Sequence, residues 1–141
     1  ILSENAYSAA YAIASAAEFV TVPRTGGTGS VGCIMLHADM SRAIDSAGVS
    51  VTLIKYGDRK ADGSEFTPLS KEAFARAQRD INAMGELFVE TVARNRGIKA
   101  AAVRATQAAT FLGAEGLDVG FADAVMAPED QAFPALLNEL A

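Results

Sequence analysis

Asn5-Ala-Tyr-Ser-Ala-Ala-Tyr-Ala-Ile-Ala-Ser-Ala-Ala-Glu18 is the stretch that decides the fold. Alanine is the strongest helix former, so residues 9–17 are predicted to form a tightly packed helix. Ser8 falls at or just before its first turn, where backbone N–H groups have no partner within the helix. A serine there commonly caps the helix. It can also be a nucleophile, because free N–H groups at a helix start can hold the oxyanion formed when a hydroxyl attacks a carbonyl. Residue type alone favours the capping role over the catalytic one.

Length and composition restrict the class of protein. The chain has 141 residues, enough for one domain with a core, and is 50% hydrophobic and 21% charged, as is usual for a soluble globular protein. The net charge of −5, with scattered Lys and Arg, argues against a nucleic-acid partner. The single cysteine, Cys33, excludes an internal disulfide and a thiolate metal site. No apolar run reaches the roughly eighteen residues that span a membrane. Because the chain starts at Ile1, in a core-like segment, we expect a fragment.

Strand and helix patterns alternate along the chain, which predicts an α/β fold. Strands are predicted over 19–22, 33–37 and 49–54, and the last two, with a helix over 40–47, would form a βαβ unit of a parallel sheet. The glycine-rich residues 25–32 are predicted to be a loop, without a nucleotide-binding spacing. Further on, the patterns predict a long helix from the N-cap Ser70 to Gly97, a shorter helix over 99–109, a turn–helix–turn over 111–125 and a helix over 131–140. The long helix should bury one stripe, formed by Phe74, Ala77, Ile81, Met84, Phe88 and Thr91.

Two side chains are candidates for acid–base chemistry. The one histidine, His37, lies in a predicted strand without metal-ligating neighbours, so a structural or surface role is expected. A lysine, with an ordinary pKa of about 10.4, accepts a proton at neutral pH only when it is desolvated or close to positive charge. Lys60 lies in a glycine-bounded loop where this is possible, although a solvated loop lysine is the commoner case.

Four segments in order resemble a known family. They are Ser8-Ala-Ala-Tyr-Ala-Ile-Ala-Ser-Ala-Ala17, Thr28-Gly-Ser-Val-Gly32, Val51-Thr-Leu-Ile-Lys-Tyr-Gly-Asp-Arg-Lys-Ala-Asp-Gly-Ser64 and Phe111-Leu-Gly-Ala-Glu-Gly-Leu-Asp-Val-Gly-Phe-Ala-Asp123. This order is similar to that of the signal-peptide-peptidase-A-like serine–lysine peptidases of the ClpP/crotonase fold. The second and third segments are most similar to the phage head (capsid-assembly and maturation) proteases of that family. The resemblance covers nearly the whole chain.

The resemblance implies a fold and a set of site residues. The fold would be α/β, the C-terminal portion of a ClpP/crotonase-like domain with a parallel sheet and packed helices. Residues 1–141 would be one peptidase domain whose N-terminal part is missing. Ser8 would be the nucleophile, Lys60 the general base and Ser30 the hydroxyl that orients the lysine amine, with the Ala9 backbone N–H as an oxyanion donor. Two alanines replace the Gly-Gly that follows the serine in the family, and the strands that carry a second oxyanion donor have no counterpart here.

The resemblance also implies an activity. The expected function is that of a serine endopeptidase with a Ser–Lys dyad, a phage or prophage head protease that cuts scaffold or capsid proteins. It would need no metal or cofactor, bind no nucleic acid, and form a homo-oligomer with shared active sites. It would act in the cytoplasm or prohead, or at a membrane if the missing N-terminus carries an anchor. The alternatives are a bacterial signal-peptide peptidase that degrades membrane-derived peptides, and a non-catalytic assembly scaffold of the same fold; the presence of Ser8, Ser30 and Lys60 argues against the scaffold.

Overall fold

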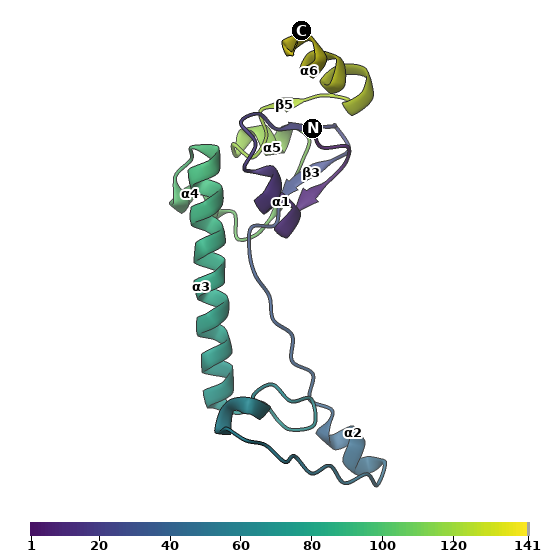
Figure 1. Cartoon of the computed structure of the whole chain (residues 1–141), viewed down its shortest axis with the longest axis vertical. Helices are drawn as coiled ribbons and strands as arrows, with labels where there is room; N and C mark the ends of the chain where they lie inside the picture. The colour runs from purple at the N-terminus through teal and green to yellow at the C-terminus, as the bar shows by residue number, and fades with distance from the viewer. Residues whose placement is uncertain (141) are drawn as a thin grey trace. The chain divides into compact units, whose positions relative to one another are not determined.

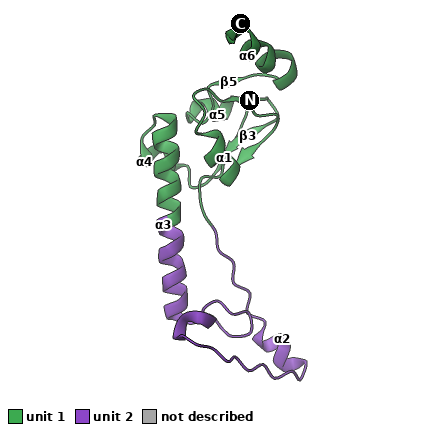
Figure 2. Ribbon diagram, in the orientation of Figure 1, with its two compact units in different colours: residues 1–33, 84–141 green, residues 34–83 purple. Residues whose placement is uncertain are grey.

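A computed structural model describes residues 1–140 (Figure 1). These form two compact units, residues 1–33 with 84 onward, and residues 34–83 (Figure 2). The helix α3 (Lys71–Arg96) contributes its first half to the second unit, which also holds α2 (Ser41–Ser46) and the 3-10 turn η1 (Asp58–Ala61). Besides the rest of α3, the first unit holds β1 (Ala6–Tyr7), α1 (Ala9–Ala14), β2 (Thr21–Val22), β3 (Gly27–Gly29), α4 (Ala100–Ala105), β4 (Thr110–Leu112), α5 (Ala114–Asp118), β5 (Ala124–Val125), the π-type turn η2 (Pro128–Ala132) and α6 (Phe133–Glu139).

The first unit has two small sheets. One has the strand order β1-β3-β4, with β1 parallel to β3 and β3 antiparallel to β4; the other pairs β2 with β5 in parallel. The α/β class with parallel strand pairs and packed helices is therefore confirmed. The sheet is mixed rather than wholly parallel, because β4 joins it in the opposite direction.

The middle of the glycine-rich segment is a strand, so the predicted loop over 25–32 is wrong in part. Gly27–Gly29 forms β3, the buried central strand of the first sheet. Glycine is needed because neighbours approach its backbone closely: a Cβ on Gly29, which has φ 108°, would lie 2.6 Å from the Ala109 carbonyl oxygen, and one on Gly27 would overlap the Tyr7 hydroxyl. The glycines therefore allow close strand packing.

Two predicted buried strands are absent from the described residues. Residues 33–37 and 49–54 form neither helix nor strand, and the predicted βαβ unit is wrong. Ile34 and Ile54 are 95% and 96% exposed, although both belong to apolar runs. An apolar pattern favours burial but supplies no partner strand, and these segments have none among residues 1–140.

The helices follow the sequence more closely. α1, α2, α4, α5 and α6 lie within the segments predicted to contain them, and α3 starts after Ser70, whose Oγ accepts the Ala73 N–H at 3.0 Å. Gly97, with φ 66°, ends α3 as expected. The predicted stripe is wrong in part, because Phe74 and Met84 are exposed. The buried side chains of α3 are Ala73, Val89, Val92 and Ala93.

The core of the first unit surrounds Tyr11 of α1. Tyr11 is fully buried, its ring lies 5.0 Å from that of Phe121, and its hydroxyl donates to the Phe121 carbonyl oxygen at 2.9 Å. Burial raises the pKa of Tyr11 above its ordinary 10.0, since the phenolate would lose its hydration. The neutral hydroxyl thus ties α1 to the segment after α5.

We expect Tyr11→Phe to lower the free energy of unfolding by about 1 kcal/mol at pH 7, because one buried hydrogen bond is lost. The folded protein holds Tyr11 protonated above pH 10, where an unfolded tyrosine ionises, so stability falls as the pH rises above 10. Tyr11→Phe should remove part of this alkaline loss, whereas Tyr56→Phe, at a fully exposed position, should not. Urea titrations at pH 7 to 11 measure both effects; equal alkaline loss in wild type and Tyr11→Phe would contradict the assignment.

Candidate active site

Ser8 lies on a sharp turn between β1 and α1. Its φ of 53° and ψ of −125° are rare for a residue with a Cβ, and its side chain makes no capping hydrogen bond. The hydroxyl is exposed at the start of the helix. The capping role that residue type favours is therefore not what Ser8 does. A strained serine at a strand-to-helix turn, with its Oγ presented to solvent, is the geometry of a nucleophile elbow.

A second strand-to-helix turn in the same unit shows the conformational cost at Ser8. Gly113 joins β4 to α5 with φ 45° and ψ −114°, nearly the same dihedral angles. There the residue is glycine, which adopts positive φ without strain. A non-glycine residue in such a conformation costs of the order of 1–3 kcal/mol and persists where its surroundings hold it. Ser8 thus occupies a position whose backbone dihedral angles favour glycine.

Ser30 lies next to Ser8. β1 and β3 are parallel with Tyr7 opposite Gly29, so the two serines follow neighbouring strands at the same edge of the sheet. The Ser8 N–H donates to the Gly29 carbonyl oxygen at 2.9 Å. Ser30 also has positive φ, 55°, and its N–H donates to Ala109 oxygen at 2.9 Å. The structure therefore places Ser8 and Ser30, two of the three residues predicted to be catalytic, at neighbouring strand ends.

Side chains from α3 and from the residue before β5 hold the end of α1 and the segment that leads from it to β2. Ser15, the buried residue that ends α1, accepts a hydrogen bond from the Asn95 amide at 3.1 Å. The side chain of the next residue of α3, Arg96, is only 5% exposed and pairs with Asp123 at 2.7 Å. Asp123 also accepts the Val20 N–H at 2.7 Å. These contacts fix the end of α1 and the segment after it, so the helix that follows Ser8 has a defined direction.

Sequence reasoning missed these anchoring residues. In the sequence Arg96 is one of the scattered Lys and Arg residues, and Asp123 is the last residue of a segment that resembles the family. Asp123 lies far along the chain from Val20, so no local pattern connects them. A buried charge needs a partner, and that requirement becomes apparent only once the burial is known.

Lys60 belongs to the second unit. It lies in η1, its side chain is exposed there, and its N–H donates to the Gly57 carbonyl oxygen at 3.1 Å. A lysine acts as a base when another surface removes it from water. The second unit supplies no such surface at Lys60, and its pairing with Ser8 rests on the sequence.

His37, the other candidate for acid–base chemistry, contacts the backbone. His37 Nε2 lies 3.1 Å from the Ser64 carbonyl oxygen, so the ring donates to the backbone of the segment after Lys60.

Among residues 1–140, no group of three or more His, Cys, Asp or Glu is arranged to hold a metal ion. In the same residues no helix has the length and apolar character needed to cross a membrane.

Comparison with known proteins places the chain among peptidases. The model of peptidase family S49 matches residues 1–136, and the chain therefore belongs to this family. The chain is 36% identical over 130 residues to the head-tail preconnector protein GP5 of Enterobacteria phage P21, covering 92% of this chain and 26% of that protein. It is 33% identical over 123 residues to the capsid assembly protease C of Escherichia phage lambda, covering 87% and 28%. The chain spans about a quarter of the length of these two relatives.

Proposed function

We propose that this chain is the catalytic part of a serine endopeptidase in which Ser8 is the nucleophile and Lys60 the general base. The observation that carries the proposal is the uncapped, strained Ser8 at the start of α1, beside Ser30. Strain of this kind is expected where the surroundings hold a residue for function rather than for stability. Membership of a peptidase family supports the same chemistry.

Each residue has a defined part in the reaction. The Ser8 Oγ attacks the peptide carbonyl while its proton passes to Lys60 Nζ. The Ala9 backbone N–H, in the first turn of α1, donates to the oxyanion. Lys60 Nζ then gives the proton to the amine of the leaving peptide. In the second step Lys60 Nζ takes a proton from water, the hydroxide attacks the acyl-enzyme, and the proton passes to Ser8 Oγ as its bond to the acyl carbon breaks. Ser30 holds the lysine amine in line with Ser8. No metal or organic cofactor takes part.

The substrates we propose are scaffold or capsid proteins of a phage head. The proposal is supported by two similar phage proteins, which are named a head-tail preconnector protein and a capsid assembly protease. The protein would then act in the prohead or in the cytoplasm where proheads assemble. We further propose that residues 1–141 form the C-terminal portion of a single ClpP/crotonase-like domain, consistent with the parallel pairing of β1 with β3 and the helices packed on them.

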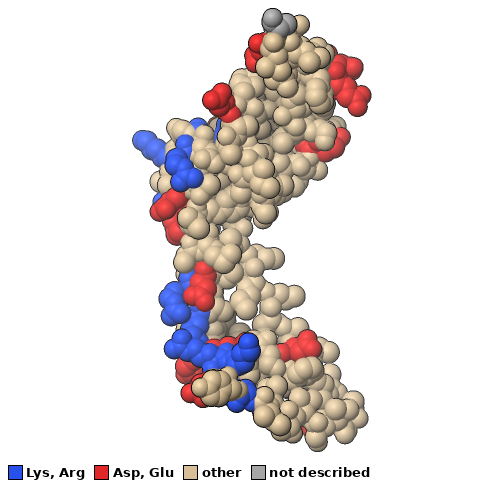
Figure 3. Space-filling view, viewed as in Figure 1, with Lys and Arg blue, Asp and Glu red and all other residues tan. Residues whose placement is uncertain are grey.

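We propose that copies of the chain associate through the second unit and share active sites. This unit exposes large apolar side chains, most of them in residues 34–40 and 49–56. On the face shown in Figure 3 its charged residues gather at the lower left, and much of the rest carries no charge. Its acidic and basic residues are equal in number, so two copies do not repel each other. Exposed apolar surface of this extent usually marks an association site. The exposed large apolar residues of the second unit are Ile34, Met35, Leu36, Met40, Val49, Val51, Leu53, Ile54, Tyr56, Phe66 and Phe74.

The test is a mixing experiment with an unfolded protein as substrate. Wild-type protein should cut it at internal bonds, and neither Ser8→Ala nor Lys60→Ala should do so alone. A mixture of the two variants should regain up to about a quarter of the wild-type activity, because one copy supplies the serine and its neighbour the lysine. Mass spectrometry of the products measures the result.

Native mass spectrometry of differently labelled copies is the control for subunit exchange. If copies exchange and the mixture stays inactive, both groups act within one chain and the shared-site model is wrong. If wild type trims only the ends of the substrate, the endopeptidase assignment is wrong.

A further inference from the structure

The segment that carries Lys60 lies between two glycines. Gly57, with φ 95°, precedes η1, and Gly63, with φ 77°, follows it. Positive φ suits glycine, which also leaves the backbone on each side free to rotate. A base must nevertheless be held within a fraction of an ångström of its productive position. Contacts outside η1 must therefore hold this segment.

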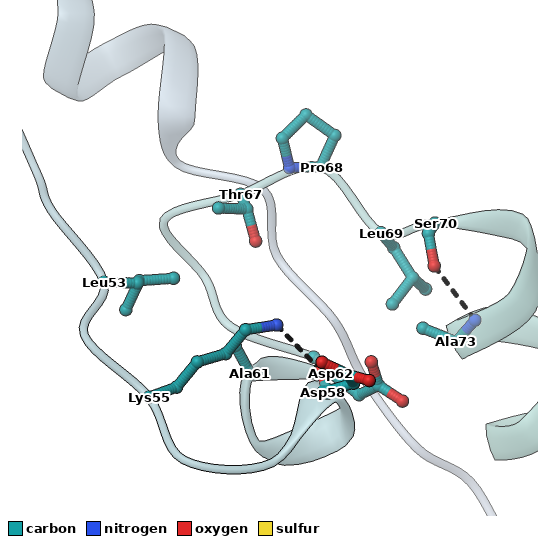
Figure 4. Close-up of a pocket in the computed structure, with 11 residues that line it drawn as sticks. Leu53, Lys55, Asp58, Ala61, Asp62, Thr67, Pro68, Leu69, Ser70 and Ala73 are labelled. Atoms are coloured by element: carbon teal, nitrogen blue, oxygen red, sulfur yellow. Dashed lines mark hydrogen bonds between the residues drawn. The ribbon is translucent and has the colours of Figure 1, made fainter.

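One such contact joins the end of η1 to α3. Asp62, the residue that ends η1, accepts two hydrogen bonds on Oδ2 from Arg76, one from Nε at 2.9 Å and a shorter one from Nη2. The Asp62 N–H also donates to the Arg59 carbonyl oxygen at 3.1 Å, so the carboxylate is coupled to the turn that holds Lys60. Asp62 and Asp58 lie at the wall of a small pocket of about 210 Å³ (Figure 4), where Lys55 Nζ donates to the backbone carbonyl oxygen of Asp58 at 2.8 Å.

We propose that Arg76 and Asp62 are positioning residues for Lys60, an inference that rests on the proposed function. The guanidinium fork fixes the carboxylate to a 26-residue helix, and the carboxylate fixes the end of η1. Lys60 lies two residues before Asp62, within the same turn. The pair thus sets the direction in which the lysine amine is presented.

If the Arg76–Asp62 pair only stabilised the fold, its loss would lower the free energy of unfolding instead of kcat. The Arg76 and Asp62 side chains are 25% and 32% exposed, and an ion pair so accessible to water adds little to stability. Loss of the pair should therefore leave the fold intact and act on the chemical step. A second pair on the same helix, Arg79 with Asp80 at 3.6 Å, is more exposed and offers a matched control.

The test compares steady-state kinetics of variants in the intact protein. Arg76→Ala and Asp62→Ala should each lower kcat by about 10- to 100-fold, as expected for a displaced catalytic group, with KM within about threefold of wild type. The exchange variant Asp62→Arg with Arg76→Asp should recover most of the lost kcat. Arg79→Ala should match wild type.

Three outcomes would overturn the inference: wild-type kcat in Arg76→Ala, a change in KM alone, or a loss of activity that parallels a loss of helix in circular dichroism. Lys60→Ala, measured alongside, separates this inference from the proposed function. An inactive Lys60→Ala with a fully active Arg76→Ala refutes the positioning role only. A fully active Lys60→Ala refutes the dyad, and the positioning role with it.

Discussion

The Ser8→Ala protein is expected to lose peptidase activity by about 10³-fold or more while remaining folded, because the side chain that forms the acyl-enzyme is gone. The Ser8 side chain makes no capping hydrogen bond, so its removal should change the free energy of unfolding by less than about 0.5 kcal/mol. Cleavage of an unfolded protein substrate measures the first effect and urea titration the second.

Ser8→Gly is the matched variant. It also lacks the hydroxyl and should be as inactive as Ser8→Ala. Glycine relieves the strain at φ 53°, as at the equivalent turn of Gly113, so Ser8→Gly should be more stable than Ser8→Ala by about 1 kcal/mol. Wild-type turnover in either variant would show that a residue other than Ser8 is the nucleophile. Equal stability of the two variants would remove the evidence for strain at residue 8.

The Lys60→Arg protein is expected to be as inactive as Lys60→Ala, again by about 10³-fold or more. A guanidinium stays protonated at any working pH, so it cannot accept the Ser8 proton, although its charge and length are close to those of lysine. Initial cleavage rates of the purified variants measure the effect.

Lys71→Arg, at an exposed position at the start of α3, provides the control and should retain wild-type activity. An active Lys60→Arg protein would show that residue 60 contributes charge rather than base catalysis. It would also exclude the proton transfer proposed from Ser8.

The helices could be predicted from sequence because their signals are local. Ser70 and Gly97 mark the two ends of α3 by chemistry that acts within one turn. The structure of segments 33–37 and 49–54 could not be predicted in this way, because an extended apolar run becomes a strand only when another strand pairs with it. The glycine content also predicted a loop at Gly27–Gly29, but these residues form a strand in which glycine allows close packing against neighbouring backbone.

The candidate site was predictable in its residue types but not in its geometry. Ser8 and Ser30 could be named from a resemblance, yet their adjacency depends on the parallel register of β1 with β3. The positive φ of Ser8 has no signature in sequence, since a non-glycine residue in that conformation is unfavourable by itself. The contacts that hold the segment after Ser8, from Asn95 to Ser15 and from Asp123 to Val20, join parts of the chain that are distant in sequence.

The most direct test of the central claim is covalent labelling of the intact protein with a fluorophosphonate probe, followed by mass spectrometry of the labelled peptide. The probe reacts with a serine hydroxyl only where the oxygen is activated and an oxyanion can be held. The account predicts a single adduct on Ser8, absent in Ser8→Ala and strongly reduced in Lys60→Arg. An adduct on Ser30 or another serine, or labelling of Ser8 at the wild-type rate in Lys60→Arg, would contradict it.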